Sequence, residues 1–569
     1  MTVAPTGPAF PIQDIPFSYR GSWLNISPVV AENTYDDDLH LVSHQTGLHP
    51  ILRFTPTTTA TIQATTTLLT WSGGGGRVEL VYDGPNTVRL RGTRLGMRIT
   101  AARRSLTPFS GTYLYRDPVD GSHVFTSYET GRRYRITVLS GDLGAQGEQA
   151  LGTADRILSL ADGQSWEIAI EEYATAGRRY ASGHTFEQLC QTNATAFRTF
   201  VDAVAPWRSP RTPAAELAAY VLWSATVDPA GFVTRPAVLM SKHWMNKVWS
   251  WDHCFNAIAL ADGQPDLAWH QFQLPFDHQD EAGALPDSVT HSEVLYNYVK
   301  PPIHGWALRH LRGRLESPLP RAEVVETYRR LARWTEFWLA SRRVPGHDLA
   351  HYQHGNDSGW DNATTFDGDR VIETADLAAF LVLQLRCLAD LAVEIGESPH
   401  EWTRTADRIF AAMLEELWNG ERFEARSALT GRRRPSTSLL DLMPVVLGPD
   451  LPAEVQNALT RGIETHLTAH GLATEPVGSA HYAADGYWRG PIWAPSTVLI
   501  EDGLRRAGKA ALADQISHRF RALCEKSGFA ENFDAETGVG LRDRAYTWTA
   551  SAYLILAGAF ERRGASGSR

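Results

Sequence analysis

The spacing of apolar residues changes once along this chain of 569 residues, and this change limits the possible folds more than any other feature. Up to about residue 180, apolar and polar residues alternate with a period of two, as in residues 77–82, 87–91, 134–138 and 166–170. Such alternation is typical of strands with one buried face. After about residue 183 the period becomes that of helices. The sequence therefore predicts a multidomain protein in which an antiparallel β-sandwich precedes an all-α domain.

The boundary between the two parts is marked by proline. Residues 184–204 are amphipathic, and residues 207–213 then contain two prolines, which end helices. We expect a β-sandwich domain at 1–182, a helical linker at 183–212 and a helical domain at 213–569. Within the sandwich, residues 55–70 fit a pair of strands. Gly73 to Gly76 are expected to form a flexible loop, and no Lys-Ser or Lys-Thr follows them as a phosphate-binding loop requires.

Helices are expected throughout the second domain, with no strand between them. Their expected ranges are 214–226, 267–272, 294–311, 322–341, 375–395, 401–417, 453–470, 496–506, 511–527 and 547–562. Because no sequence repeats at a fixed period, a closed barrel of helical hairpins is favoured over a solenoid. Long loops rich in Gly, Trp and Asp join these helices and are the expected place for chemistry.

The charge of the chain excludes several classes of partner. Its 54 basic and 64 acidic residues give a net charge of -10, without a long basic run. Nucleic acid or an anionic membrane surface as the main partner requires clustered positive charge, so we expect neither. The first residues lack the basic patch and apolar stretch of a secretory signal, and no window is apolar enough to span a membrane. A cytoplasmic location is expected.

No metal or cofactor is expected. His278 and His291 lie near several acids, but their spacing matches no known ligand motif. A Gly-x-Ser-x-Gly elbow, a dinucleotide-binding glycine fingerprint and a kinase signature are all absent from the sequence. The four cysteines form no Cys-x-x-Cys pair and are expected to be buried thiols. They are Cys190, Cys254, Cys387 and Cys524.

Tryptophan is unusually frequent, with 18 residues, as many as tyrosine. Indole faces stack on sugars as well as filling cores. In the first of four notable loops, Trp249 and Trp251 stand beside Asp252. The two rings could stack on a sugar while the carboxylate accepts hydrogen bonds from its hydroxyls. The alternative is a tryptophan pair in the core with Asp252 capping a helix.

The other loops supply further carboxyls. Asp361 directly follows a Gly-Trp pair, and contact with an indole raises a carboxyl pKa until the group can act as a general acid. For Asp357 and Asp361 the alternative is a role in turns or helix caps. Glu531 is flanked by apolar and amide residues, and residues 534–538 read as a turn. Arg489 could bind a substrate hydroxyl or form a structural ion pair.

Two isolated carboxyls in loops at one end of a helical barrel fit glycoside hydrolysis. One acid protonates the leaving oxygen and one carboxylate activates water. A separation of about 6.5 to 9.5 Å leaves room for that water and inverts the anomeric centre. We therefore expect a small carbohydrate as the substrate.

At these loops the chain resembles glycoside hydrolase family 63 and its relatives, inverting α-glycosidases whose (α/α)6 toroid is similar to that of trehalase. The resemblance covers about residues 210–562. It rests on Trp249-Ser-Trp-Asp252, Asp357-Ser-Gly-Trp-Asp361, Tyr487-Trp-Arg-Gly-Pro-Ile-Trp493 and Glu531-Asn-Phe-Asp534, in this order.

The resemblance implies that Asp361 is the general acid, that Glu531 is the general base, and that no metal is essential. Residues in the matching loops would bind the sugar that is released. They are Trp251, Asp252, Gln279, Trp360, Trp488, Arg489 and Trp493, and Trp249, Lys300, Tyr487 and Trp548 complete the expected set.

The family's substrates differ. Glucosylglycerate and mannosylglycerate hydrolases resemble the chain through residues 300–306, whereas its β-rich first part is more like the larger family 63 α-glucosidases. Trehalases carry Glu where this chain has Asp357, which disfavours trehalose. We expect an exo-acting α-glucosidase on a short oligosaccharide or small α-glucoside. The alternatives are an α-mannosidase, an α-L-rhamnosidase-like enzyme, a glucosylglycerate or mannosylglycerate hydrolase, a glycoside phosphorylase and a non-catalytic sugar-binding protein.

Overall fold

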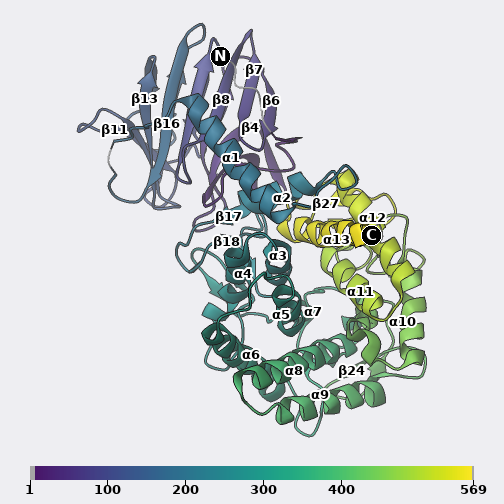
Figure 1. Cartoon of the computed structure of the whole chain (residues 1–569). Coiled ribbons are helices and arrows are strands. Elements are labelled where there is room, and N and C mark those ends of the chain that lie inside the picture. Colours follow the sequence, from purple (N-terminus) through teal and green to yellow (C-terminus); the bar gives the residue numbers. More distant parts are fainter. Residues whose placement is uncertain (1–6, 178, 567–569) are drawn as a thin grey trace. The chain divides into compact units, whose positions relative to one another are not determined.

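The computed structural model of the chain describes residues 7–177 and 179–566 (Figure 1). They fall into two compact units. The first comprises the described residues up to Ala203 together with residues 219–247 and 290–292, and the second comprises the rest. Compact units are not necessarily domains that fold independently, so the domain boundaries expected at residues 182 and 212 stay predictions.

Two antiparallel sheets form most of the first unit, as the alternating pattern predicts. In sheet order, the nine-stranded sheet contains β1 (Ala9–Phe10), β6 (Thr61–Thr65), β7 (Leu69–Gly73), β8 (Gly76–Tyr82), β9 (Thr87–Thr93), β16 (Ser165–Tyr173), β13 (Arg133–Ser140), β12 (His123–Ser127) and β11 (Thr112–Arg116). The seven-stranded sheet contains β14 (Leu143–Gln146), β15 (Ile157–Leu160), β10 (Met97–Ala101), β5 (His49–Pro56), β4 (Thr34–Ser43), β3 (Leu24–Ala31) and β2 (Phe17–Ser18).

The two sheets pack face to face. The ring of Phe54 on β5 lies 6.3 Å from that of Trp71 on β7, and the hydroxyl of Tyr82 on β8 donates to the carbonyl of Leu24 on β3 over 3.1 Å. All four residues are buried. The β-sandwich expected from the sequence is confirmed.

Two details of this region differ from expectation. The strand pair expected at residues 55–70 is the hairpin of β6 and β7, which spans residues 61–73. Gly73 pairs with Gly76, and Gly74 and Gly75 have φ values of 58° and 72°. These are the angles of a tight two-residue hairpin turn, which glycine adopts without strain. The expectation of a flexible loop there was wrong.

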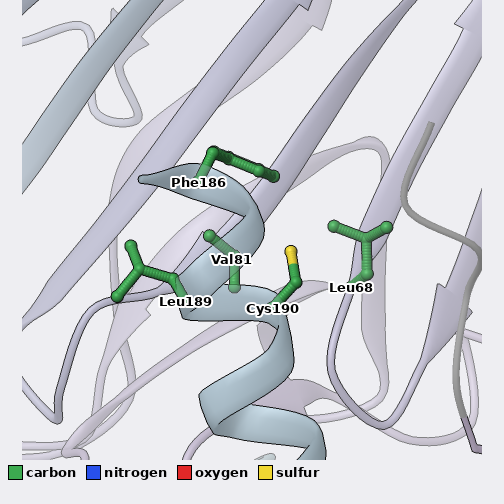
Figure 2. Packing of buried hydrophobic residues seen from close by; sticks show 5 residues of the cluster. All are labelled: Leu68, Val81, Phe186, Leu189 and Cys190. Atoms are coloured by element: carbon green, nitrogen blue, oxygen red, sulfur yellow. The ribbon is translucent and has the colours of Figure 1, made fainter. Parts of the chain in front are cut away.

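Helix α1 (Phe186–Val204) covers the outer face of the nine-stranded sheet. Leu80 and Tyr82 of β8 point into the sandwich, so Val81 between them points outward. Figure 2 shows Val81 and Leu68 beneath Phe186, Leu189 and Cys190, and all five are buried. Burying such side chains contributes about 1.5 to 3 kcal/mol each.

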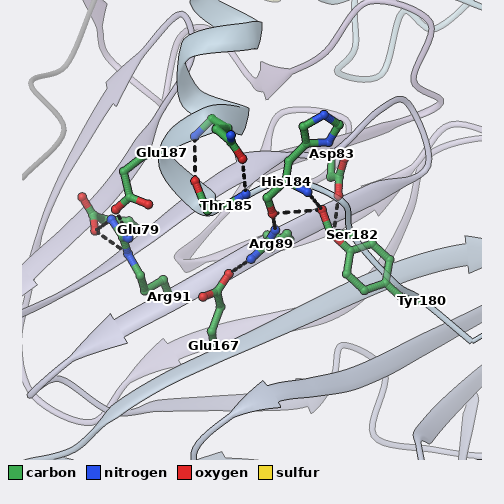
Figure 3. A network of polar contacts seen from close by, with 11 residues as sticks. Glu79, Asp83, Arg89, Arg91, Glu167, Tyr180, Ser182, His184, Thr185 and Glu187 are labelled. Atoms are coloured by element: carbon green, nitrogen blue, oxygen red, sulfur yellow. Dashed lines mark hydrogen bonds and ion pairs between the residues drawn. The ribbon is translucent and has the colours of Figure 1, made fainter. Parts of the chain in front are cut away.

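Ion pairs surround this apolar contact. Arg89 on β9 pairs with Glu167 on β16, and its guanidinium also donates to the carbonyl of His184 over 2.7 Å (Figure 3). Its neighbour Arg91 bridges Glu79 on β8 and Glu187 on α1. The first turn of α1 is therefore tied to three adjacent strands.

In the second unit the helices form two concentric layers. The inner elements are α3 (Asp252–Leu260), α5 (His304–Arg312), α8 (Ala375–Ile395), η3 (Leu439–Asp450), α11 (Ala494–Arg506) and α13 (Thr547–Ser566). Each packs against the next in this order, and α13 packs against α3. The ring is therefore closed, and the expected (α/α)6 barrel is confirmed.

The outer helices pack against this ring. They are α4 (Pro265–Asp277), α6 (Arg321–Ser341), α9 (His400–Ala412), α10 (Ala453–His466) and α12 (Ala510–Ser527). Two further elements extend this set: α2 (Ala215–Ala225) precedes the ring, and the π-helix η2 (Met413–Leu417) continues α9. The expected helices are confirmed except that 294–311 begins only at His304 and 453–470 ends at His466. The sequence missed α3, η3 and the short helix α7 (Gly355–Ser358).

Short strands lie between the helices, contrary to expectation. They are β17 (Thr226–Val227), β18 (Ala237–Val238), β19 (Val248–Trp249), β20 (Ser288–Val289), β21 (Val294–Leu295), β22 (His351–Tyr352), β23 (Ile372–Glu373), β24 (Ala425–Ser427), β25 (Arg433–Arg434), β26 (Asn532–Phe533) and β27 (Gly540–Leu541). Strands of two or three residues leave no periodic signal in a sequence.

The connections of the ring are asymmetric. Those from an inner to the following outer element are short, such as residues 261–264, 396–399 and 507–509. Those from an outer to the following inner element are long, such as residues 342–374 and 528–546. Short connections join antiparallel neighbours, so the long ones gather at the N-terminal ends of the inner elements. Every motif loop found in the sequence belongs to this end.

Replacing Gly92 with Ala tests the packing of the sandwich. A Cβ at Gly92 on β9 would overlap the indole of Trp166, its partner on β16, which is 2% exposed. Overpacking of this kind costs about 1 to 3 kcal/mol. We expect Gly92→Ala to lower the free energy of unfolding in urea by that amount. The control is Gly144→Ala, also on a strand, where a Cβ would meet only the carbonyl oxygen of Ser159 at an ordinary contact distance of 3.8 Å. An equal loss in both variants would contradict the packing described.

Candidate active site

Five buried tryptophans from the motif loops form a continuous chain of rings. Trp360 lies 4.5 Å from Trp488, and Trp488 stacks on Trp493 at 4.0 Å, measured between ring centroids. Trp493 is 6.0 Å from Trp548, and Trp548 meets Trp251 edge-on at 5.0 Å. None is more than 3% exposed. The expected site residues Trp251, Trp360, Trp488, Trp493 and Trp548 therefore lie together.

The loop that carries Asp361 is fixed against this chain. Gly359 has a φ of 74°, and a Cβ there would overlap the Trp251 ring. A Cβ at Gly355, the first residue of the short helix α7 (Gly355–Ser358), would overlap the carbonyl of Asp361. These glycines permit approaches that no other residue allows. They fix the loop that leads to Asp361 against the Trp251 ring and the start of α7.

Asp357 has a structural role. Its carboxylate, 1% exposed, pairs with Arg342 at 2.8 Å and accepts from the backbone N–H groups of Gln353 and Val299 at 2.8 and 3.1 Å. It thus joins the α6–α8 loop to the α4–α5 loop. These contacts support the structural role that the sequence analysis gave as the alternative for Asp357.

Three acids and one lysine form a charged cluster beside this loop. Lys300 lies 3.0 Å from Asp287 and donates to the carbonyl of Asn356 over 2.8 Å. Burial raises the pKa of Asp361, and Lys300 opposes the rise. Burial also raises the pKa of Asp252, the first residue of α3, to about 8. Within the described part of the chain, one buried oxygen of Asp252 has no hydrogen-bond partner, so it is available to a ligand.

Glu531 occupies an equally buried position. It is 3% exposed, its pKa is raised to about 8 mainly by burial and also by Asp543, and Arg542 opposes the rise. The Tyr487 hydroxyl forms a hydrogen bond with its side chain that also lowers the pKa. Tyr487 itself has a φ of 63°, an uncommon conformation for a residue with a side chain.

The charges of both candidate catalytic carboxyls influence the pKa of one hydroxyl, that of Tyr487. Burial raises the pKa of Tyr487 far above its ordinary value, and the charges of Glu531, Asp361 and Asp252 raise it further. The charges of carboxyls from three loops that are far apart in sequence thus all act on the Tyr487 hydroxyl.

Three expected site residues have structural partners. The amide of Gln279 donates to the carbonyls of Gly283 and Arg330, at 2.9 and 3.0 Å. Arg489 pairs with Asp367 and donates to the carbonyl of Asn362 over 2.7 Å.

Trp249 is half-buried in β19, and its carbonyl lies 3.0 Å from Nδ1 of His253. These contacts supply a reason for Gln279, Arg489 and Trp249 that needs no substrate.

The sequence analysis did not assign Asp287, Arg542 or Tyr546. Asp287 pairs with Lys300, and the ring of Tyr487 lies 4.9 Å from the Arg542 guanidinium. Burial raises the pKa of Tyr546 far above its ordinary value, and the negative charges of Glu531 and Asp252 raise it further. Asp287 stands in a loop already singled out, and Tyr546 stands two residues before Trp548, so proximity to the motifs was the available signal.

Other features of the described residues agree with an ordinary globular chain. The four cysteines are buried and unpaired. Residues 534–538 form the expected turn, in which Asp534 accepts from the N–H groups of Glu536 and Thr537. Among residues 7–177 and 179–566, no group of three or more His, Cys, Asp or Glu could hold a metal ion, and no helix is long and apolar enough to cross a membrane.

Comparison with known proteins identifies the class of the fold and site. Residues 245–549 match the family model of the mannosylglycerate hydrolase MGH1-like glycoside hydrolase domain. The match covers more than half of the chain, which therefore belongs to this family of glycoside hydrolases. The chain is thus an enzyme with a glycosidase domain like those of family 63, as the motif resemblance implies.

The relatives are moderately similar in sequence. A mannosylglycerate hydrolase of Rubrobacter radiotolerans is 25% identical over 57% of this chain and 92% of its own length. A glucosylglycerate hydrolase of Mycolicibacterium hassiacum is 23% identical over 60% of this chain and 97% of its own length.

Two solved structures share the fold. A family 63 mannosylglycerate hydrolase from Thermus thermophilus, in complex with glucose, is 20% identical over 61% of this chain and all of its own, with a TM-score of 0.53. A bacterial glucoamylase complexed with acarbose is 10% identical over 99% of this chain and 96% of its own, with a TM-score of 0.65. The match to the glucoamylase includes the N-terminal sheets.

Replacing Asp357 with Ala tests its structural role. The change leaves Arg342 and two backbone N–H groups without their carboxylate. Breaking a buried ion pair costs about 3 to 5 kcal/mol, and we expect this loss in the free energy of unfolding measured with urea. The control is Asp369→Ala, which removes a more exposed pair with Arg434 and should cost less than about 1 kcal/mol. A stability near wild type in Asp357→Ala would refute the role.

Replacing Tyr487 with Phe tests its hydrogen bond to Glu531. The hydroxyl favours the ionised carboxylate, so its removal raises the pKa of Glu531 above about 8. If Glu531 must be ionised for activity, the acidic limb of the kcat/KM profile moves to higher pH. The measurement is kcat/KM against pH, with Tyr328→Phe on α6 as the control that leaves the profile in place. If the acidic limb stays in place in Tyr487→Phe, this hydroxyl does not influence the ionisation of Glu531.

Proposed function

We propose that this glycoside hydrolase is an exo-acting, inverting enzyme that releases a hexose from a small α-glycoside. The observation that carries the proposal is the chain of buried tryptophan rings, Trp360, Trp488, Trp493, Trp548 and Trp251, which joins the motif loops around the two carboxyls Asp361 and Glu531. Asp361 donates a proton to the leaving oxygen, and Glu531 takes a proton from the attacking water. The bond between the anomeric carbon and the leaving oxygen breaks while the water oxygen bonds from the opposite face.

The two roles follow from the motif resemblance, since burial raises the pKa of both carboxyls. For Asp361, burial favours the protonated form that a general acid requires. Glu531 has Arg542 and the Tyr487 hydroxyl beside it, which both favour its ionised form. Arg542 and the Tyr487 hydroxyl therefore favour the carboxylate form of Glu531, which a general base requires.

The released sugar is proposed to stack on tryptophan and to bond Asp252. Asp252 offers the buried oxygen that lacks a hydrogen-bond partner within the described part of the chain, and Lys300 holds the neighbouring acids in place. An apolar wall with a few polar groups is the usual composition of a small-molecule site. Trp249, Gln279 and Arg489 contribute to this site by supporting the loops.

For the substrate we propose a small α-hexoside, either an α-glucoside or an α-mannoside, with glucosylglycerate and mannosylglycerate as the first compounds to test. The support is that the relatives at 25% and 23% identity are a mannosylglycerate and a glucosylglycerate hydrolase. Glycerate is a compact leaving group, which agrees with an exo-acting enzyme. A short α-glucosyl oligosaccharide is the second candidate, because the glucoamylase shares both parts of the fold.

The proposal is tested by following hydrolysis of α-glucosides, α-mannosides and their glycerates by proton NMR. We expect the β-anomer of the hexose to appear before mutarotation. Asp361→Asn and Glu531→Gln should each reduce kcat by about 100- to 10,000-fold, the usual contribution of a general acid or base. Asp390→Asn, at an exposed ion pair with Arg309, serves as the control and should retain most activity. Initial release of the α-anomer would contradict inversion, and near-normal turnover in either variant would overturn its assignment.

A further inference from the structure

The first unit carries a groove rich in arginine that has no part in the site above. It encloses about 330 Å³ and is lined by side chains of the seven-stranded sheet and of two neighbouring loops. Five of its residues are arginines and two are aspartates, in a chain whose net charge is -10. The arginines are Arg53, Arg98, Arg103, Arg104 and Arg156.

The strand register explains why these arginines share a face. Arg98 on β10 pairs with Thr55 on β5, and Thr100 pairs with Arg53. Residues two apart on a strand point to the same side, so Arg53 and Arg98 point outward from one face of the sheet. Arg103 and Arg104 follow β10 directly, and Arg156 directly precedes β15.

Some of this charge is already compensated. Arg53 pairs with Asp38 at 2.7 Å, and Arg103 pairs with Glu129 at 2.8 Å. Arg98 and Arg104 are exposed, and neither side chain takes part in an ion pair within the described residues. These two guanidinium groups are therefore free to bind an anion.

Arg156 provides an independent indication. It is 2% exposed, yet within residues 7–177 and 179–566 it forms no ion pair, and its guanidinium donates only to backbone carbonyls such as that of Gly152, at 2.9 Å. Its Nε is buried without a hydrogen-bond partner in this part of the chain. Asp155, its neighbour in the chain and also a groove residue, partly compensates the charge of Arg156 without forming an ion pair within the described residues. Burying a cation that is only partly compensated is costly, and a bound anion would lower this cost.

We propose that this groove binds a small organic anion through a carboxylate or phosphate group. The planar guanidinium fork matches both groups with two parallel hydrogen bonds. Arg98 and Arg104 contact the anion directly, while Arg156 supplies positive charge from the floor of the groove. The volume suits a molecule the size of a sugar acid or sugar phosphate and excludes a polymer.

The test is isothermal titration calorimetry of the full chain with inorganic phosphate and, separately, with citrate at matched ionic strength. We expect saturable binding of at least one probe. The double variant Arg98→Gln/Arg104→Gln should weaken it at least about tenfold, because two charge-assisted contacts are lost. Both side chains are exposed, so the fold is expected to persist, which a thermal unfolding scan verifies.

The control is Arg198→Gln, which removes an exposed arginine of α1 outside the groove and should leave binding unchanged. Binding of phosphate alone assigns the phosphate group, and binding of citrate alone assigns the carboxylate. Absence of saturable binding by either probe overturns the proposal, as does binding that is equally strong in the double variant.

Discussion

The contact between Trp251 and Trp548 is the interaction on which the glycosidase unit depends. Trp251 precedes the first inner helix of the ring and Trp548 begins the last, and their rings meet at 5.0 Å. Here the ring of inner helices closes. Because the ring is closed, the long loops before its inner elements face one another, and the motifs reach a common centre.

Burial at this centre determines its chemistry. Removal of water raises the pKa of Asp252, Asp361 and Glu531 together. Without a counter-charge, such a group of acids would resist ionisation altogether. Lys300 lowers the pKa of Asp252 and Asp361, and Arg542 lowers that of Glu531, so both cations favour the ionised carboxylates.

The sequence predicted the order of the two parts because their apolar periods differ, and it predicted the site because its motifs are contiguous. Helix α3 was missed because all nine of its residues are buried, which leaves no polar face to mark a period. Element η3 was missed because Pro444 and Pro449 interrupt it. Partnerships across the fold, such as Lys300 with Asp287 or Arg489 with Asp367, could not be predicted, since nothing in the local sequence specifies the partner.

Closure of the ring by its last helix also bears on how the chain folds. The contact of Trp251 with Trp548 can form only after α13 has been synthesised, nearly at the end of the chain. Contacts between such distant residues form late because the entropy of joining them must first be overcome. Until then the side of α3 that packs on α13 stays uncovered. A nascent chain of this design therefore keeps apolar surface exposed from the synthesis of α3 until that of its last helix.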